Sequence, residues 1–465
     1  MILLRSIVAK ILYMRVHFIA IGGAAMHNLA LALHKKEFHV SGSDDEIFDP
    51  SKSRLEQYGL LPEKWGWFPE KITADIDAII LGMHARIDNP ELLRAKELGL
   101  KIYSYPEYIY EQTKDKTRVV IGGSHGKTTT TSMVMHVLKS NDIDFDYMVG
   151  AQIEGFDTMV KLSKDTKIAV FEGDEYLASP IDPRPKFHLY HPHIALLTGI
   201  AWDHINVFPT FENYLSQFEK FIQLIKPNGS LIYFDNDEHI RPMVNKKRND
   251  LTYLPYRSHP HKVKDGISSL TTKSGDIELS IFGEHNLQNL QGAHLICKEL
   301  GLSDEQFYSS IRNFGGAAKR LQTLAQNEHT TVYQDFAHSP SKLQATTKAV
   351  KNQFTDRKLI ACMELHTFSS LKEEFLPEYK DSMAMADIAM VYFNPKTVEH
   401  KKLKAISSQQ VEEAFGGNNL KVYTDSQILL DNLMHLNFEK TNLLLMSSGN
   451  FSGLNLQELA DKVIE

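Results

Sequence analysis

Short apolar runs alternate with longer amphipathic stretches along the chain. The apolar runs lie at residues 16–21, 78–81, 119–121, 168–171, 194–197, 359–362, 388–391 and 443–446. Their apolarity is continuous, which is typical of strands buried on both faces, and the amphipathic stretches predict helices that cover parallel sheets. Several runs end in Gly, Asp, His or Asn, where α/β proteins place their ligand loops. The pattern therefore predicts an α/β fold with sites at the carboxyl ends of strands.

Two polar segments, residues 111–118 and 324–330, interrupt this rhythm and are typical of connections between domains. A chain of 465 residues exceeds the usual size of one domain, so several cores are expected. We place the domain boundaries at residues 14–113, 114–325 and 326–465. The polar stretch 257–279 is expected to form a hairpin.

The composition is that of an ordinary globular protein, with 42% hydrophobic and 23% charged residues. A net charge of −7, with basic residues spread along the chain, argues against nucleic acid as a partner. Cys297 and Cys362 lie in apolar stretches and predict buried free thiols in a reducing compartment. No run is long enough to span a bilayer, and Arg5 and Lys10 interrupt the first apolar stretch, so residues before Met14 are expected to lie outside the fold. We expect a cytoplasmic protein with no membrane partner.

The strongest local pattern is the strand, glycine-rich turn and helix at residues 119–130. The turn allows backbone N–H groups to converge on phosphate oxygens, and a helix N-terminus adds positive potential. Lys127 supplies a cation, and the hydroxyl of Thr128 can ligate Mg²⁺. The loop is shorter than the usual one. The usual spacing would place its first glycine at position 121, where this chain has Ile121. The predicted ATP-binding residues here are Gly123, Ser124, His125, Gly126, Lys127, Thr128 and Thr129.

The string Gly-Ser-His-Gly-Lys-Thr-Thr at residues 123–129 resembles the shortened phosphate loop of the Mur ligases, ATP-dependent amide ligases of bacterial cell-wall metabolism. Later motifs follow in that family's order, from Met14 to the end of the chain. The resemblance implies a Rossmann-like N-terminal domain that binds a UDP-sugar, a central P-loop ATPase domain, and a Rossmann-like C-terminal domain for the amine. It also implies ATP and Mg²⁺ as cofactors.

The resemblance further implies a metal site. The string Glu172-Gly-Asp-Glu-Tyr176 follows a strand and is similar to the family's acidic motif, so Glu172 would hold Mg²⁺ together with Thr128. An acidic surface turn would be the simpler explanation if the motif stood alone. His204, in a motif similar to the family's Asp-His pair, would organise the metal or the acyl group.

Further motifs imply the nucleotide site. Asn286 and Asn289 match residues that read adenine and ribose, and their i, i+3 spacing puts both on one helix face. Arg320 matches a phosphate-binding arginine, whose planar fork suits that role. Asp335 and His338 would face the nucleotide when the domains close. His204 or His338 would be the base that deprotonates the amine.

A second glycine turn follows the first strand, at Gly22 and Gly23, and Asp44 ends the next strand. Such a pair predicts a dinucleotide or a nucleotide-sugar site, so a dehydrogenase is one alternative. The dinucleotide fingerprint is mostly missing, because Ala20 and Ala25 occupy two of its glycine positions. The turn resembles that of the muramate-binding ligases. This resemblance implies that Gly22, Gly23 and Asp44 bind a UDP-sugar. A nucleotide-switched binding protein is the second alternative.

The sequence contains features of two branches of the family that use different acceptor amines. Residues 182–192, with Arg184 and Lys186, are similar to an insertion in ligases that recycle a peptide, and two cations suit an acceptor with several carboxylates. Residues 364–369 look more like the branch that adds L-alanine, but Ser369 stands where that branch has an arginine. The resemblance therefore predicts joining of UDP-N-acetylmuramate to the tripeptide L-alanyl-γ-D-glutamyl-meso-diaminopimelate in peptidoglycan recycling. The alternative is ligation of L-alanine in peptidoglycan biosynthesis.

Overall fold

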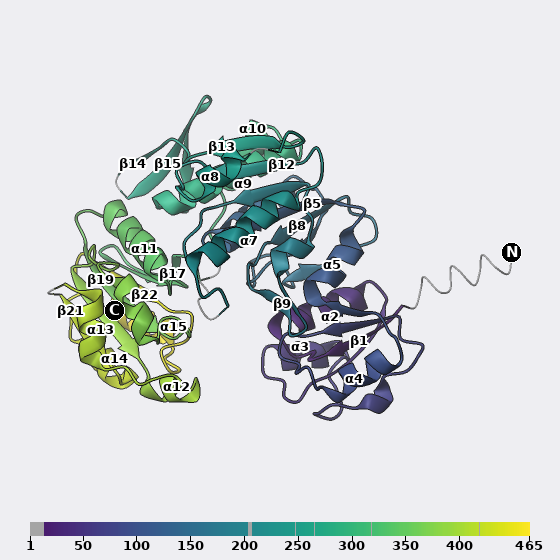
Figure 1. Ribbon diagram of the computed structural model, residues 1–465. Helices are drawn as coiled ribbons and strands as arrows, with labels where there is room; N and C mark the ends of the chain where they lie inside the picture. Colours follow the sequence, from purple (N-terminus) through teal and green to yellow (C-terminus); the bar gives the residue numbers. More distant parts are fainter. Residues whose placement is uncertain (1–13, 203–206, 247, 265, 318, 418) are drawn as a thin grey trace.

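The computed structural model describes residues 14–202, 207–246, 248–264, 266–317, 319–417 and 419–465. The prediction made for the residues before Met14 lies outside this part of the chain. All eight apolar runs contribute to strands, and three wholly or mainly parallel sheets with helices on their faces confirm the predicted α/β class. Figure 1 shows the central part of the chain between the N-terminal part and the C-terminal part. Within the described residues, we find no helix long and apolar enough to cross a membrane.

The first sheet has four parallel strands in the order β2-β1-β3-β4. Its elements are β1 (Arg15–Ile19), α2 (Ala24–Lys35), β2 (His39–Ser43), α3 (Ser51–Gln57), η1 (Pro69–Lys71), β3 (Ala78–Leu81), α4 (Pro90–Glu97), β4 (Ile102–Ser104) and α5 (Tyr105–Thr113). The first apolar run is longer than its strand, because β1 ends at Ile19 and Ala20 has a positive φ of 68°. This turn directs the chain from the sheet into the glycine loop.

The central sheet has seven strands in the order β13-β12-β11-β5-β8-β6-β7, parallel except for β7. Its strands are β5 (Thr117–Gly122), β6 (Asp146–Met148), β7 (Val160–Lys161), β8 (Ile168–Glu172), β11 (Ile194–Leu197), β12 (Ser230–Phe234) and β13 (Thr252–Tyr256). Its helices are α6 (Lys127–Ser140), α7 (Phe211–Gln223), α8 (Ile240–Asn245), α9 (Glu284–Glu299) and α10 (Asp304–Ile311). Strands β5, β8 and β11 are neighbours, so the loops at their carboxyl ends meet.

Two small antiparallel sheets extend the central part. The hairpin of β9 (Leu177–Ser179) and β10 (Asp182–Pro185) leads into the short helix η2 (Lys186–Leu189). The predicted hairpin at residues 257–279 is a three-stranded sheet of β14 (His261–Lys264), β15 (Ile267–Thr272) and β16 (Gly275–Leu279).

The third sheet has six strands in the order β17-β18-β22-β19-β20-β21, parallel except for β17. Its strands are β17 (Gln322–Gln326), β18 (Thr330–Asp335), β19 (Lys358–Leu365), β20 (Ile388–Phe393), β21 (Leu420–Tyr423) and β22 (Thr441–Met446). The helices are α11 (Pro340–Gln353), η3 (Glu373–Tyr379), α12 (Pro395–His400), α13 (Ser408–Phe415), α14 (Ser426–Met434) and α15 (Leu456–Ile464). The polar stretch 324–330 thus contains the end of β17 and the first residue of β18, and the third sheet already begins at residue 322.

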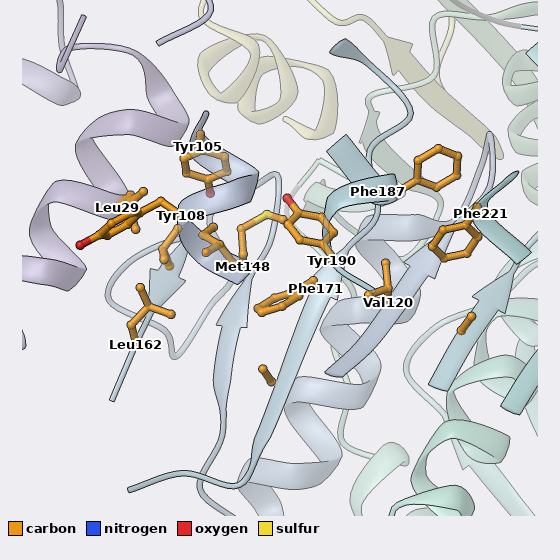
Figure 2. Close-up of a cluster of buried hydrophobic side chains, with 14 of the residues drawn as sticks. Leu29, Tyr105, Tyr108, Val120, Met148, Leu162, Phe171, Phe187, Tyr190 and Phe221 are labelled. Atoms are coloured by element: carbon orange, nitrogen blue, oxygen red, sulfur yellow. The ribbon is translucent and has the colours of Figure 1, made fainter. Parts of the chain in front are cut away.

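One apolar cluster joins the first sheet to the central sheet. Figure 2 shows Leu29, Tyr105 and Tyr108 of the first part beside Met148 and Tyr190 of the central part. Polar contacts add to this junction, since the side chain of Asn28 accepts from the amide of residue 159 at 2.9 Å. The first and central parts are therefore packed through a continuous core. Both cysteines are buried free thiols, as predicted.

Candidate active site

The loop after β5 has a conformation that only glycine adopts without strain. Gly126, directly before α6, has a φ of 73°, and an added Cβ would lie 2.1 Å from Oδ1 of Asn289. Gly123 has a φ of 126°, and an added Cβ would lie 2.1 Å from the hydroxyl oxygen of Thr198. The positive φ values turn the chain sharply from strand to helix, and the close contacts bring α9 and the end of β11 against the loop.

A cavity of about 970 Å³ lies at this loop and is bordered by all three parts of the chain. Most of the predicted residues border it, namely Ser124, His125, Gly126, Lys127, Thr128, Thr129, Glu172, Asn286, Asn289, Arg320, Asp335 and His338. Gly123 shapes the loop but is not part of the cavity wall. Gly22, Gly23 and Asp44 are not part of it either. His204 lies outside the described residues.

The ammonium of Lys127 donates to the carbonyl of Gly123 at 2.6 Å and to the carboxylate of Glu175 at 2.7 Å. Burial acts to lower the pKa of Lys127, but the carboxylates around it, Glu175 foremost, outweigh burial and raise that pKa. Glu175 is almost fully buried, and its second oxygen accepts from the hydroxyl of Tyr214 at 3.0 Å. Tyr214 also contacts the hydroxyl of Ser124 at 2.9 Å. No sequence motif indicated that Glu175 and Tyr214 anchor the lysine.

The residues predicted to hold a metal are two neighbouring oxygen groups. The hydroxyl of Thr128 donates to Glu172 at 2.8 Å, and the other carboxylate oxygen of Glu172 accepts from the amide of Gly150 at 2.7 Å. No group of three acidic, histidine or cysteine side chains suited to a metal exists among the described residues. One carboxylate and one hydroxyl fit Mg²⁺, which usually completes its shell with phosphate oxygens and water.

Helix α9 supplies the amides predicted to read the nucleotide. Asn286 and Asn289 both border the cavity, and the amide nitrogen of Asn286 donates to the carbonyl of Phe282 at 2.8 Å. His285, which no sequence motif singled out, also borders the cavity, and burial lowers its pKa to about 4. His285 is therefore neutral near physiological pH and adds no charge to this wall.

The C-terminal part contributes Arg320, whose guanidinium lies over the ring of Phe336 at 4.6 Å. Burial lowers the pKa of Arg320, and the nearby carboxylates of Asp335 and Glu172 act in the opposite direction. Arginine remains charged under any such shift of moderate size, so this wall keeps a cation for phosphate.

Asp335 borders the cavity, but both of its oxygens have backbone partners, since the amides of Leu321 and Ala337 each donate to it at 2.7 Å. Burial raises the pKa of Asp335. The carboxylate thus holds the turn between β18 and α11. His338 contacts the carbonyl of Phe336 through Nδ1 at 2.9 Å. A carbonyl can only accept, so Nδ1 carries a proton and Nε2 is the basic atom of the neutral ring.

One contact links the phosphate loop directly to the C-terminal part. Nε2 of His125 lies 2.8 Å from the hydroxyl of Ser341 at the start of α11. The predicted loop residue His125 thus meets another domain across the cavity.

The glycine turn after β1 is arranged differently. The amide of Gly22 donates to the carboxylate of Asp44 at 2.7 Å, and burial raises the pKa of Asp44 to about 6. Ala24 and Ala25, in the first turn of α2, border the cavity in place of the predicted residues. The first domain therefore reaches the cavity through the N-terminus of α2 and through Tyr105 at the start of α5.

The two cations of residues 182–192 do not lie together. Arg184 is half exposed and contacts Asp182 at 2.6 Å and Glu107 at 2.9 Å, away from the cavity wall. Lys186 borders the cavity and contacts Asp174 at 2.6 Å. Of the two cations, Lys186 borders the cavity and Arg184 does not, because an acidic pair holds the guanidinium of Arg184 at the surface.

Three domain descriptions of one family match the chain in the expected order. Residues 15–117 match the Mur ligase family catalytic domain, residues 121–297 the Mur ligase middle domain, and residues 319–449 the Mur ligase glutamate ligase domain. The chain belongs to the Mur ligase family. It is therefore an ATP-dependent amide ligase, which replaces the dehydrogenase and nucleotide-switch alternatives.

Relatives and solved structures agree with this membership. The chain is 28% identical to the UDP-N-acetylmuramate–L-alanine ligase of Carboxydothermus hydrogenoformans over 94% of each chain. It is 29% identical to the enzyme of that name from Syntrophomonas wolfei, over 96% of each chain.

In structure, it is similar to a UDP-N-acetylmuramate–alanine ligase from Thermotoga maritima, with a TM-score of 0.69 and 19% identity over 97% of this chain and 98% of that one. It is also similar to a murein peptide ligase from Psychrobacter arcticus, with a TM-score of 0.66 and 22% identity over 97% and 98%. These likenesses confirm the predicted three-domain architecture.

Proposed function

We propose that this Mur ligase joins an amine to the carboxylate of UDP-N-acetylmuramate. The supporting observation is that one cavity is bordered by the phosphate loop, the acidic motif and the first turn of α2. ATP on the loop and an acyl substrate held from the first domain would share this space. The substrate named for the relatives, UDP-N-acetylmuramate, carries the carboxylate that such a reaction needs. We place the reaction in the cytoplasm.

In the first step, a carboxylate oxygen of the sugar nucleotide attacks the γ-phosphorus of ATP. The bond between this phosphorus and the β,γ-bridging oxygen breaks, and ADP leaves with that electron pair. Two anions must meet, so Lys127 would turn from Glu175 to the phosphates while Arg320 approaches them from the C-terminal side. Mg²⁺, held by Thr128 and Glu172, would supply further neutralisation of charge.

In the second step, the amine nitrogen attacks the carbonyl carbon of the acyl-phosphate. The bond from this carbon to the bridging oxygen breaks, phosphate leaves, and the nitrogen gives a proton to a base. His338 is one candidate, through Nε2, and His204 is the other predicted one. Three walls from three domains would exclude water, which would otherwise hydrolyse the intermediate.

For the acceptor, the relatives favour L-alanine over the tripeptide that the sequence motifs predicted. Two ligases named for L-alanine match this chain over almost its whole length at 28% and 29% identity. The structural likeness to a murein peptide ligase is at 22% identity and supports the fold. We therefore take L-alanine as the first candidate acceptor.

The tripeptide is the second candidate, because two features of the chain still favour it. Residues 182–192, which include β10 and the short helix η2, are similar in sequence to the insertion of the peptide-recycling branch. Ser369 stands where the alanine-adding branch has an arginine, so a group that would bind a small acceptor's carboxylate is absent from that position.

The deciding experiment measures phosphate release with ATP, Mg²⁺, UDP-N-acetylmuramate and either L-alanine or the tripeptide. Higher kcat/KM with L-alanine would support the first candidate, and higher kcat/KM with the tripeptide would reverse the order. Lys127→Met is the control for contaminating phosphatase. No release above this control with either amine would contradict UDP-N-acetylmuramate as the acyl substrate.

A further inference from the structure

The segment after the acidic motif is tied back to that motif by its backbone. The amide of Lys186 donates to the carbonyl of Tyr176 at 2.9 Å, and the amide of Phe187 donates to the carbonyl of Asp174 at 3.1 Å. The start of η2 is thus held at a fixed place beside Glu172. The side chain of Lys186 therefore extends from a backbone that is hydrogen-bonded to the acidic motif.

Lys186 places an ammonium group on the cavity wall. Its side chain is 24% exposed, and its contact with Asp174 at 2.6 Å uses one of three N–H donors. Asp174 holds the ammonium in place, and the remaining donors can meet an anion. Lys127 of the phosphate loop is paired with Glu175 in the same way. Two adjacent carboxylates of the acidic motif thus each hold a lysine at the cavity.

Tyr190, at the end of η2, borders the same cavity and is fully buried. Its hydroxyl has no hydrogen-bond partner among the described residues. Figure 2 shows this hydroxyl directed towards Met148 and Tyr105, which also border the cavity. Burial raises the pKa of Tyr190, so the hydroxyl stays a neutral donor. A buried hydroxyl without a partner costs free energy, and a ligand oxygen would remove that cost.

Both groups lie near the acidic motif, because Lys186 contacts Asp174 at 2.6 Å and the charges of Asp174 and Glu172 act on Tyr190. Ala24 and Ala25 bring the N-terminus of α2 to the same cavity from the first domain, and Glu172, in contact with Thr128 of the phosphate loop, also borders it. A carboxylate that attacks the γ-phosphorus must lie between a sugar nucleotide held from the first domain and ATP on the phosphate loop. A positive ammonium and a neutral hydroxyl together suit a carboxylate, which accepts hydrogen bonds at both oxygens.

We propose that Lys186 and Tyr190 bind the carboxylate of the sugar-nucleotide substrate and hold it for attack on ATP. This inference rests on the proposed function and moves Lys186 from acceptor recognition to recognition of the acyl substrate. The insertion after the acidic motif then serves the first half of the reaction.

The test compares the binding of UDP-N-acetylmuramate and UDP-N-acetylglucosamine to the full chain by calorimetry. The second compound has the same nucleotide and a closely related sugar but no lactyl carboxylate. Lys186→Gln and Tyr190→Phe are each expected to weaken UDP-N-acetylmuramate binding about tenfold, because one hydrogen bond to a charged group is lost. UDP-N-acetylglucosamine binding should change by less than about twofold, and Lys186→Arg should restore most of the loss.

The chain offers a matched control for each variant. Tyr108 is another fully buried tyrosine of the same apolar cluster whose hydroxyl has no partner among the described residues, but it does not border the cavity. Lys161 pairs with Asp144 away from the cavity. Tyr108→Phe and Lys161→Gln should leave both affinities unchanged.

The outcomes distinguish failure of the inference from failure of the proposed function. If Lys186→Gln and Tyr190→Phe keep the wild-type preference for UDP-N-acetylmuramate, the inference is wrong while the proposed function stands. If the loss in steady-state assays lies only in the KM of the amine, Lys186 serves the acceptor and the inference is again wrong. If the wild-type chain binds neither sugar nucleotide, the proposed function itself fails, and the inference fails with it.

Discussion

The chain contains two glycine turns between a strand and a helix, and they differ in what surrounds them. After β5, Lys127 lies at the cavity, and the carboxylate of Glu175 holds its ammonium. After β1, the carboxylate of Asp44 accepts directly from the amide of Gly22, and no lysine follows the turn. In sequence, both turns are typical of phosphate sites.

The difference teaches that a glycine turn provides amide donors but does not decide what they bind. A carboxylate next to the turn at Gly22 already uses one donor and would repel an incoming diphosphate if it were ionised. At the turn after β5, the carboxylates face a lysine, and that lysine can move to the phosphates. A carboxylate from a separate part of the sequence, Glu175 at one turn and Asp44 at the other, distinguishes the two turns, because Glu175 pairs with a lysine and Asp44 with a backbone amide.

The largest effect is expected from Lys127→Ala, which removes the cation that distinguishes the two turns. Ligation should fall about 1000-fold, as expected for loss of a group that stabilises transition-state charge. The free energy of unfolding should also fall by about 3 kcal/mol, because Glu175 keeps a buried charge without its cation. Phosphate release and urea denaturation measure the two effects.

The double variant Lys127→Ala/Glu175→Gln should regain most of the stability but none of the activity. If Lys127→Ala retained activity, the loop after β5 would be no different in function from the loop after β1.

Glu172→Gln should have the next largest effect, with kcat falling roughly 100-fold at low Mg²⁺. The amide keeps the contact with Thr128 but lacks the charge that a hard cation needs. A titration of activity against Mg²⁺ checks this, and part of the loss should be recovered at high metal concentration. An unchanged Mg²⁺ dependence would move the metal site to another carboxylate.

Asp44→Asn should have a moderate effect on the affinity for UDP-N-acetylmuramate, and this effect should depend on pH. The fold raises the pKa of Asp44 from 3.8 to about 6, so it favours the neutral carboxyl group. The contribution of this pKa shift to the free energy of unfolding is therefore complete below pH 3.8 and is lost as the pH rises through about 6. Over the same range, the affinity of the wild-type chain for UDP-N-acetylmuramate should decrease, because a negative charge develops beside the turn.

The Asn variant should bind with an affinity that varies little with pH, and about threefold more tightly than wild type near neutral pH. Calorimetry across this pH range provides the measurement. Weaker binding by Asp44→Asn at every pH would instead support the predicted direct role of Asp44 in holding the sugar nucleotide.

The smallest effect is expected from Gly23→Ala. An added Cβ at this position would lie 3.5 Å from the nearest side-chain atom, an ordinary contact, and the backbone φ of −57° suits any residue. The free energy of unfolding should change by less than about 1 kcal/mol. The matched variant Gly126→Ala should lose about 2 kcal/mol or more, because its φ is 73° and Asn289 blocks the added carbon. Equal losses of unfolding free energy in the two variants would show that the two turns do not differ in their need for glycine.

The sequence was sufficient where the information is local. Each continuous apolar run became part of a buried strand, because such a run has no polar face to turn to water. The loop at residues 123–129 could be recognised as a phosphate turn from its glycines, its lysine and its neighbouring elements. The order of motifs along the chain also indicated the Mur ligase family, and the three domain matches confirm that prediction.

Partners that come from remote parts of the chain could not be inferred in this way. Asp335 was expected to face the nucleotide and does border the cavity, but its bonds to the amides of Leu321 and Ala337 could not be foreseen, since they depend on how β18 ends against the preceding turn. Arg184 and Lys186 are two residues apart and both carry a positive charge, yet only Lys186 borders the cavity. Asp182 and, in the first domain, Glu107 hold Arg184 at the surface, and nothing within residues 182–192 signals the contact with Glu107.

The sequence by itself determined the fold class, the family and the chemical type of each predicted group, because strand burial, turn geometry and side-chain chemistry follow from neighbouring residues. Only the tertiary structure decided which groups meet, since the carboxyl ends of β5, β8 and β11 bring Lys127, Glu172 and the loop after Leu197 together from separate parts of the chain. It also decided that Tyr190 is buried at the cavity, with no partner for its hydroxyl among the described residues. Charge pairing and burial depend on distances in space, and distances along the chain do not specify them.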